Sequence, residues 1–290
     1  MLEAKINGYA LGYFEAWNLE SLEAVIEAAE ETFSPVILGF GCFQKDSEWL
    51  ESGGLERLAA LGKVVTEWSK VPTALLLNEA QNFRQALMGI RMGFNAILLA
   101  AGQLTFENNI ALTKKLVEFA HPVGVAVEAE LGQLPDASGT NSHSQDASLT
   151  DPDMAAQFVQ ETNVDALAVS VGNIHVLTEG KAKIDFSRLK AIHARVSAPL
   201  VIHGGTGFPE EAVSEAIANG VVKFNVGTSL KQSFFAGMTK ITSPTNSRRA
   251  SLALGTRKPE DSLSEARQAV KVEIKRLMSI YGCYGRARPK

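Results

Sequence analysis

The stretch VIHGGTGFPEEAVSEAIANGVVKFNVGTSLK, from Val201 to Lys231, is the part of the chain that decides the fold. The apolar run Pro199–Ile202 ends in His203 and a glycine-rich turn, and a helical pattern follows over Pro209–Ala218. A second apolar run, Val221–Phe224, then ends in Asn-Val-Gly-Thr. Parallel α/β proteins bind phosphate at such strand ends, because backbone N–H groups and the next helix N-terminus point at the anion. The stretch therefore predicts two successive β/α units with a phosphate site and an imidazole beside it.

The same alternation continues outward over the rest of the chain. Short apolar runs occur at Tyr9–Phe14, Pro35–Phe40, Thr73–Leu77, Ala96–Leu99, Val123–Val127, Ala166–Val169, Pro199–Ile202 and Val221–Phe224. Helical patterns separate them at Leu19–Glu31, Leu55–Ser69, Phe83–Met92, Asn108–Ala120, Pro152–Glu161, Phe186–Ala194 and Pro209–Ala218, and the pattern Thr228–Met238 follows the eighth run. Runs that are apolar on both faces are typical of a buried parallel sheet. Eight β-then-α units predict a (β/α)8 TIM barrel, and 290 residues suit one such domain spanning residues 1–290.

Two polar insertions interrupt this rhythm. Residues 132–148 follow the fifth strand and are rich in Ser, Asp and Gly, and we expect them to form a mobile lid over the catalytic face; plain disorder is the alternative. Residues 239–262 form a second insertion, a loop before a final helix expected at Ser264–Tyr281.

Charge and cysteine content limit the partners and the location. The net charge of −4 favours neither nucleic acid nor a membrane surface, and no run reaches the length of a membrane span. The N-terminus lacks the layout of a secretion signal. Cys42 and Cys283 are too few for a disulfide framework, so we expect reduced thiols and a cytoplasmic protein.

Function in a barrel is carried at the carboxyl ends of its strands. Those positions hold two imidazoles, His175 and His203, and up to four carboxylates, Glu15, Glu79, Glu128 and Glu130. His175 and His203 with Glu79 make a two-histidine, one-carboxylate set of the kind that binds Zn2+ or Fe2+. The alternative is a neutral, hydrogen-bonded histidine pair beside the phosphate pocket.

The chain resembles the class II (metal-dependent) ketose-bisphosphate aldolases, the family of fructose- and tagatose-bisphosphate aldolases. The resemblance covers nearly the whole chain and rests on HGGTG, NVGTSLK, VPTALLLNEA, VAVEAELGQL and TNVDALAVSVGNIHV. It implies a (β/α)8 barrel, a phosphorylated ketose as substrate, Zn2+ as cofactor and a homo-oligomer, either a dimer or a tetramer.

The resemblance also implies roles for single residues. His175 and His203 match two zinc ligands, and Glu79 stands where the family has the third, a histidine. Asn78 replaces the aspartate that acts as general acid and base, and its amide has no proton to titrate. Glu130 matches the glutamate associated with metal handling, and Glu15 replaces a strand-one asparagine. The residues that follow the phosphate-binding pattern are Gly204, Gly205, Thr206, Gly207, Asn225, Gly227 and Thr228.

Two further departures concern the surroundings of the site. The polar segment after strand four is reduced to Ala100-Ala101-Gly102-Gln103. Val176 replaces a glycine after the sixth-strand histidine, and because a β-branched residue disfavours positive φ we expect this corner of the phosphate site to be remodelled.

Three functions fit this mixture of retained and altered residues. The first is aldol cleavage or condensation of a phosphorylated ketose at an altered metal and acid/base site, with Glu15, Glu79 or Glu130 taking over from Asn78. The second is a metal-independent isomerase or epimerase that acts on a sugar phosphate through paired carboxylates. The third is a sugar-phosphate-binding protein without catalytic activity.

Overall fold

A computed structural model shows a single closed barrel of eight parallel strands in the order β1 to β8. The structure describes residues 1–135, 137, 148–177, 179–241 and 250–288. The strands are β1 (Leu11–Glu15), β2 (Val36–Gly41), β3 (Thr73–Ala80), β4 (Ala96–Leu99), β5 (Ala126–Leu131), β6 (Ala166–Val169), β7 (Leu200–Ile202) and β8 (Val221–Val226). The predicted (β/α)8 fold is confirmed, and each of the eight apolar runs contains or overlaps a strand.

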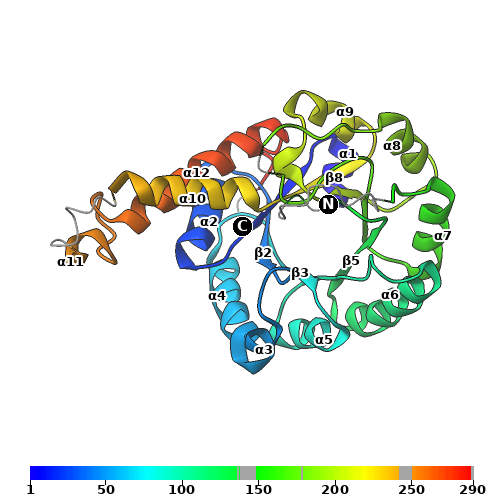
Figure 1. Cartoon of the computed structure of the whole chain (residues 1–290), viewed down its shortest axis with the longest axis horizontal. Coiled ribbons are helices and arrows are strands. Elements are labelled where there is room, and N and C mark those ends of the chain that lie inside the picture. The colour runs from blue at the N-terminus through cyan, green and yellow to red at the C-terminus, as the bar shows by residue number, and fades with distance from the viewer. Residues whose placement is uncertain (136, 138–147, 178, 242–249, 289–290) are drawn as a thin grey trace.

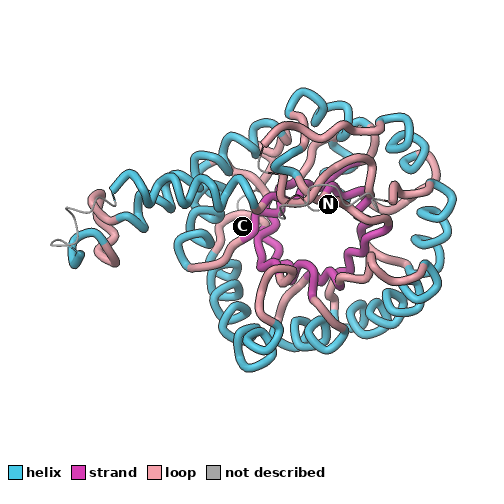
Figure 2. Tube along the Cα trace, viewed as in Figure 1, coloured by secondary structure: helices cyan, strands magenta, loops and turns pink. Residues whose placement is uncertain are grey.

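Helices surround the barrel, as Figures 1 and 2 show. They are α1 (Leu2–Asn7), α2 (Leu19–Glu31), α3 (Ser47–Trp49), α4 (Leu55–Trp68), α5 (Phe83–Met92), α6 (Phe106–Ala120), α7 (Pro152–Thr162), α8 (Phe186–His193), α9 (Val213–Ala218), α10 (Thr228–Ile241), α11 (Ala250–Ala253) and α12 (Ser262–Ile280). From α2 to α9 they run counterclockwise in Figure 1. Because β/α/β crossovers are right-handed, the carboxyl ends of the strands face the viewer there.

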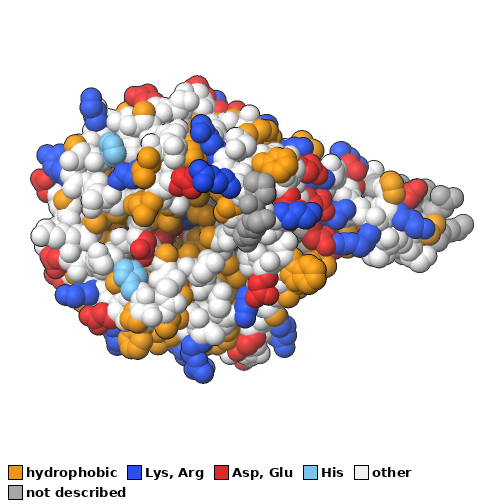
Figure 3. All heavy atoms as spheres, turned by 180° about the vertical axis from the view of Figure 1, so that it is seen from behind, with side chains coloured by type: hydrophobic (Ala, Val, Ile, Leu, Met, Phe, Trp, Pro, Cys, Tyr) orange, Lys and Arg blue, Asp and Glu red, His pale blue; other side chains and the backbone are white. Residues whose placement is uncertain are grey.

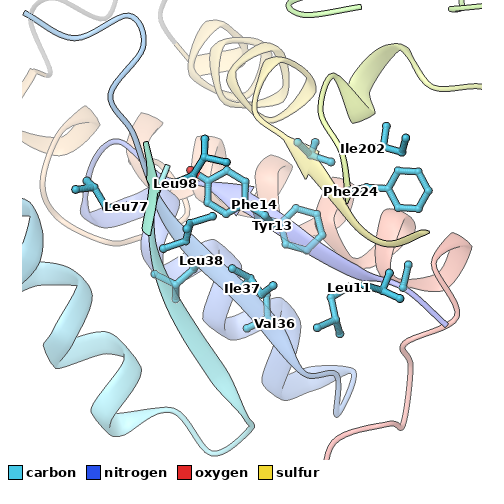
Figure 4. Packing of buried hydrophobic residues seen from close by; sticks show 14 of the residues in the cluster. Leu11, Tyr13, Phe14, Val36, Ile37, Leu38, Leu77, Leu98, Ile202 and Phe224 are labelled. Carbon is cyan, nitrogen blue, oxygen red and sulfur yellow. The ribbon is translucent and has the colours of Figure 1, made fainter. Parts of the chain in front are cut away.

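The strands form because their side chains are buried on both sides. All six residues of β2 and of β8 are buried, and in β8 this includes the polar side chains of Lys223 and Asn225. Leu38, Leu77 and Leu98 come from neighbouring strands and pack in the cluster that Figure 4 draws, with Phe14 and Phe224 in the same view. One continuous core of this kind is what a single domain requires.

Polar residues account for the main differences from the predicted boundaries. β3 continues past Leu77 to Ala80, and β5 runs to Leu131, because Asn78, Glu128 and Glu130 lie within strands rather than in loops. The short helices α1, α3 and α11 were not predicted, and α11 falls inside the insertion expected at residues 239–262. Residues 136 and 138–147 of the expected lid, and residues 242–249 of that insertion, lie outside the described residues.

α10 and α12 pack side by side and extend beyond the barrel wall together with α11 (Figure 1). α12 also packs along α2, so the last long helix of the described chain lies against the first helix that follows a strand. None of the described helices combines the length and the apolar character that a membrane span would need.

The face at the amino ends of the strands, seen in Figure 3, is hollowed near its centre, and hydrophobic side chains gather there. A cavity of 320 Å³ lies at this end of the barrel, lined largely by apolar residues of β1 to β5. Lys223 and Glu128 also line it, and both side chains are almost fully buried inside the barrel.

Candidate functional site

A larger cavity of 620 Å³ opens at the carboxyl ends of the strands, where the barrel fold places catalytic sites. It brings together most of the residues singled out in the sequence, namely Glu15, Asn78, Glu79, His175, His203, Gly204, Thr206, Asn225, Gly227 and Thr228. Gly205, Gly207 and Glu130 are not among its lining residues. Glu130 nevertheless lies next to His203, with its Oε2 atom 3.9 Å from Nδ1.

Glu79 enters the cavity because β3 is irregular near its end. The register between β3 and β4 shifts between Leu77 and Ala80, and Glu79 has φ 56°. A non-glycine residue in this left-handed region is uncommon and is often held there by a functional constraint. The result is that one ligand atom each of Glu79, His175 and His203 lies within 4.8 Å of the others.

His203 is oriented by a buried ion pair inside the barrel. Its Nε2 donates to Glu128 Oε1 at 3.1 Å, and Glu128 Oε2 accepts from Lys223 Nζ at 2.5 Å. With Nε2 donating to the Glu128 carboxylate, Nδ1 lies 3.6 Å from Glu79 Oε1. Nδ1 is buried and has no hydrogen-bond partner. A buried, unpartnered ring nitrogen beside a carboxylate fits a metal ligand whose other nitrogen is held by a carboxylate.

His175 stands parallel to His203, with ring centroids 5.6 Å apart and an angle of 13° between the planes. Its backbone is tied to the start of the 132–148 segment, since His175 N–H donates to Pro135 O and Ala137 N–H donates to His175 O. Val176, the next residue, has φ 53°. The valine thus adopts a left-handed backbone that its β-branch disfavours, and the expected remodelling of this corner of the phosphate site stays a prediction.

Burial and neighbouring charges divide the carboxylates of the site into two kinds. Burial raises the pKa of Glu79 to about 7, against the attraction of His203 and with the help of Glu130. Burial also raises the pKa of Glu130. Burial acts on Glu128 in the same sense, but Lys223 and His203 outweigh it and lower the pKa of that carboxyl. Glu128 is thus the most acidic of the three, whereas the pKa of Glu79, at about 7, lets this carboxyl change its protonation state close to neutral pH.

Asn78 lies at the floor of the cavity, where its Oδ1 accepts a hydrogen bond of 3.3 Å from Asn225 Nδ2. The bond joins β3 to β8 across the barrel opening. Asn225 Oδ1 is buried and unpartnered, as is the hydroxyl of Tyr13, which also lines the cavity. Both atoms are therefore available to hydrogen-bond a ligand.

The glycine-rich turn after β7 forms one wall. Gly204 has φ 70°, and a Cβ there would overlap the carbonyl oxygen of Ile174, so a side chain is excluded. Thr206 accepts a hydrogen bond from Ser229 N–H in the first turn of α10, which joins this turn to the helix. Gly205 and Gly207 pack the turn against β8 and Leu177 instead of facing the cavity. The N-terminus of α10 thus lies beside Thr206, an arrangement that suits a phosphate group.

Two lysines that we did not single out in the sequence also line the cavity. Lys231 Nζ donates to both carboxylate oxygens of Glu15 at 3.1 Å, and Lys45 Nζ lies 3.9 Å from the same carboxylate. Lys231 is in the first turn of α10, at the end of the stretch that decided the fold. Lys45 follows β2 in a loop without any recognisable motif, so no local pattern could have identified it.

Comparison with known proteins agrees with this geometry. The family described as "Fructose-bisphosphate aldolase class-II" matches residues 1–286. The chain belongs to the class II fructose-bisphosphate aldolase family. Within the family, it is 35% identical to a fructose-bisphosphate aldolase of Thermus caldophilus, over 98% of this chain and 97% of the relative.

Two further comparisons concern a single relative, YdjI of Escherichia coli K12. In sequence, the chain is 36% identical to YdjI, described there as an uncharacterized protein, over 77% of this chain and 79% of YdjI. A crystal structure described as the YdjI aldolase superposes with a TM-score of 0.81 at 30% identity, covering 99% of this chain and 96% of that one. The resemblance seen in the sequence is thus confirmed at the level of the aldolase family.

Proposed function

We propose that the protein catalyses aldol cleavage of a phosphorylated ketose, and the reverse condensation, with a divalent metal ion held by Glu79, His175 and His203. One observation carries the proposal: three ligand atoms lie within 4.8 Å of one another, in the same cavity as the turn after β7 and the N-terminus of α10. A metal site next to a phosphate site is what a ketose phosphate requires, because its carbonyl lies a short distance from its phosphate ester.

The donor set fits zinc. Two imidazole nitrogens and one carboxylate oxygen are common ligands of catalytic zinc sites, and Nδ1 of His203, which has no hydrogen-bond partner, would bind the ion once it is deprotonated. When bound, such an ion would supply Lewis acidity toward the substrate carbonyl. Glu79 brings a negative charge that a histidine would not, so we expect a weaker Lewis acid than a three-histidine site would give.

Proton transfer needs a group other than Asn78, whose amide does not titrate. Glu15 is bound through both oxygens to Lys231, so both oxygens already accept hydrogen bonds. Glu130 lies beside His203, has a raised pKa and is paired with no lysine among the described residues. Because it is not among the residues that line the cavity, we assign proton transfer to Glu130 acting through one bridging water, and expect Glu130→Gln to lower kcat by about 10²- to 10⁴-fold.

The remaining features of the proposal follow from the family. The partner is a phosphorylated sugar, the protein works in the cytoplasm, and it assembles as a homo-oligomer, a dimer or a tetramer. Neither a metal-independent isomerase nor a binding protein without activity draws support from the relatives.

The test begins with the metal content of untagged protein, purified without chelators, by elemental analysis. Zinc is expected at close to one ion per chain, and cleavage of ketose phosphates should then be detectable as release of a triose phosphate. Glu79→Gln should lower the zinc content. Protein that stays metal-free after incubation with zinc would overturn the metal site. Zinc-loaded protein that cleaves no ketose phosphate, over a panel of sugars and chain lengths, would overturn the reaction.

A further inference from the structure

The cavity has one wall that belongs to neither the metal site nor the phosphate site. Glu79, His175 and His203 come from the ends of β3, β6 and β7, and the phosphate turn follows β7 and β8. The other lining residues come mainly from the ends of β1 and β2 and from α10; they include Glu15, Trp17, Phe43, Gln44, Lys45 and Lys231. A ligand that spans the phosphate and metal sites must place its far end against this wall, which we call the distal wall.

The positive charges of the distal wall are already engaged by Glu15. Lys231 binds both of its carboxylate oxygens, and Lys45 lies 3.9 Å away while also donating to Gly41 O at 2.5 Å. The described residues that line the cavity include no arginine. A second phosphate on the ligand would therefore have to compete with Glu15 for the same two ammonium groups.

Glu15 has little room to move aside. Its Oε2 fills the space where a Cβ of residue 227 would be, and its Oε1 lies 3.0 Å from the Cβ position of residue 41. Both residues are glycines: Gly41 is the last residue of β2, and Gly227 directly follows β8. Only 16% of the Glu15 side chain is exposed. The carboxylate is thus held between two backbones and keeps the two ammonium groups engaged.

The neutral groups around it suit an uncharged, hydroxylated chain. The hydroxyl of Tyr13 and the amide oxygen of Asn225 are buried, unpartnered and part of the cavity lining. Trp17 and Phe43 add aromatic rings to the distal wall. Apolar surfaces with a few placed hydrogen-bonding groups are typical of sites for small polar molecules.

We propose that the substrate is a ketose with a single phosphate ester, and that Glu15 is the specificity-determining residue that excludes a second anionic group from its far end. This deepens the proposed function and rests on it. A second phosphate that binds Lys231 or Lys45 must compete with the Glu15 carboxylate beside it, and should lose roughly tenfold or more in affinity compared with a site that lacks this carboxylate.

The experiment compares fructose 1-phosphate with fructose 1,6-bisphosphate, which differ only in the second phosphate. Dissociation constants are measured by calorimetry on the zinc-loaded protein, and kcat/KM is measured for each sugar that is cleaved. In the wild type, the monophosphate should bind at least about tenfold more tightly. Glu15→Gln should reduce this preference to less than about threefold. Glu118→Gln makes the same chemical change at an exposed position of α6 and should leave the preference unchanged.

Lys231→Gln gives a second variant in case Glu15→Gln fails to fold. It removes a positive charge from the distal wall, and the preference for the monophosphate should increase. Equal or tighter binding of the bisphosphate by the wild type, or failure of both sugars to bind, would overturn the inference. Preferential binding of the monophosphate without cleavage of any ketose phosphate would overturn the proposed function alone. Cleavage with a preference for the bisphosphate would overturn the inference alone.

Discussion

Glu79 is the residue on which the chemistry of the site depends most. Burial raises its pKa from 4.5 to about 7, so the native protein binds this proton more tightly than the unfolded chain. A proton held more tightly by the native state stabilises it at low pH, and that stabilisation is lost as the pH rises from about 4.5 to about 7. His203, whose pKa is raised by the surrounding carboxylates, contributes in the same direction.

We therefore expect the metal-free protein to lose stability over this range, with a slope from Glu79 of up to about 1.4 kcal/mol per pH unit. Urea unfolding between pH 4.5 and 8, with a chelator present, measures the slope. In Glu79→Gln the slope should be smaller by this amount. Identical slopes in the variant and the wild type would contradict the assignment.

The pair Asn78 and Glu79 can be restored to the family pattern by the double change Asn78→Asp with Glu79→His. Histidine tolerates the left-handed backbone of position 79 better than most residues do, so the turn should survive. Because the change returns both an acid/base group and a neutral ligand, we expect aldol cleavage to rise by about 10²-fold or more. A triose-phosphate release assay on zinc-loaded protein measures it. An unchanged rate would mean that the losses at Ala100 and Val176 also limit the reaction.

At the scale of elements, β5 and β8 are joined across the barrel interior by Glu128 and Lys223, both almost fully buried. Removing one partner of a buried ion pair leaves the other charge without compensation and typically costs about 3–5 kcal/mol. We expect Lys223→Met and Glu128→Gln each to lower the free energy of unfolding by this order.

The double variant should be more stable than the sum of the two losses predicts, because neither charge is then left alone. A urea double-mutant cycle gives the coupling between the two side chains. If the two losses in unfolding free energy simply add, the interaction between Lys223 and Glu128 contributes nothing to stability.

The sequence predicted the strands well where they are apolar throughout, and less well where they carry polar residues. β4 and β6 coincide with the predicted runs because they are apolar throughout. The run predicted for β3 ended too early, at Leu77, and the run predicted for β5, Val123–Val127, both began and ended too early, since Asn78, Glu128 and Glu130 look like loop residues in the chain. They can lie in strands because the barrel interior supplies partners from distant strands, which no local pattern reveals.

The same reason limits prediction of the site. His175, His203 and the glycine-rich turn could be placed from their positions after apolar runs. Lys45, Lys231 and Glu15 could not be brought together in advance, because Lys45 lies in a loop and Lys231 on a helix, where the order of the strands does not say which way a side chain points. The left-handed backbone of Glu79 also depends on the irregular pairing of β3, which the sequence does not mark.

For the molecule as a whole, a row of ion pairs connects α12, near the end of the chain, to α2. Glu23, Glu27 and Glu31 of α2 pair with Arg267, Lys271 and Lys275 of α12. Exposed pairs contribute about 0.2–1 kcal/mol each, and salt screens them.

The triple change of Arg267, Lys271 and Lys275 to Met should lower the free energy of unfolding by about 1–2 kcal/mol at low salt, as measured with urea. The difference from the wild type should shrink in about 1 M NaCl, where the Debye length is about 3 Å. A difference that does not depend on salt would point to packing rather than charge.

The close contact between Glu15 and Gly227 has a consequence for the history of the site. A Cβ at position 227 would overlap the Glu15 carboxylate, so the two positions are not free to change independently. Glutamate at 15 is therefore accepted more readily beside glycine at 227 than beside a larger residue, which would have to displace the carboxylate. Gly227→Ala should accordingly be harmful in the present protein and tolerated once Glu15 is replaced by Ala, a case of epistasis that thermal unfolding of the four combinations would display.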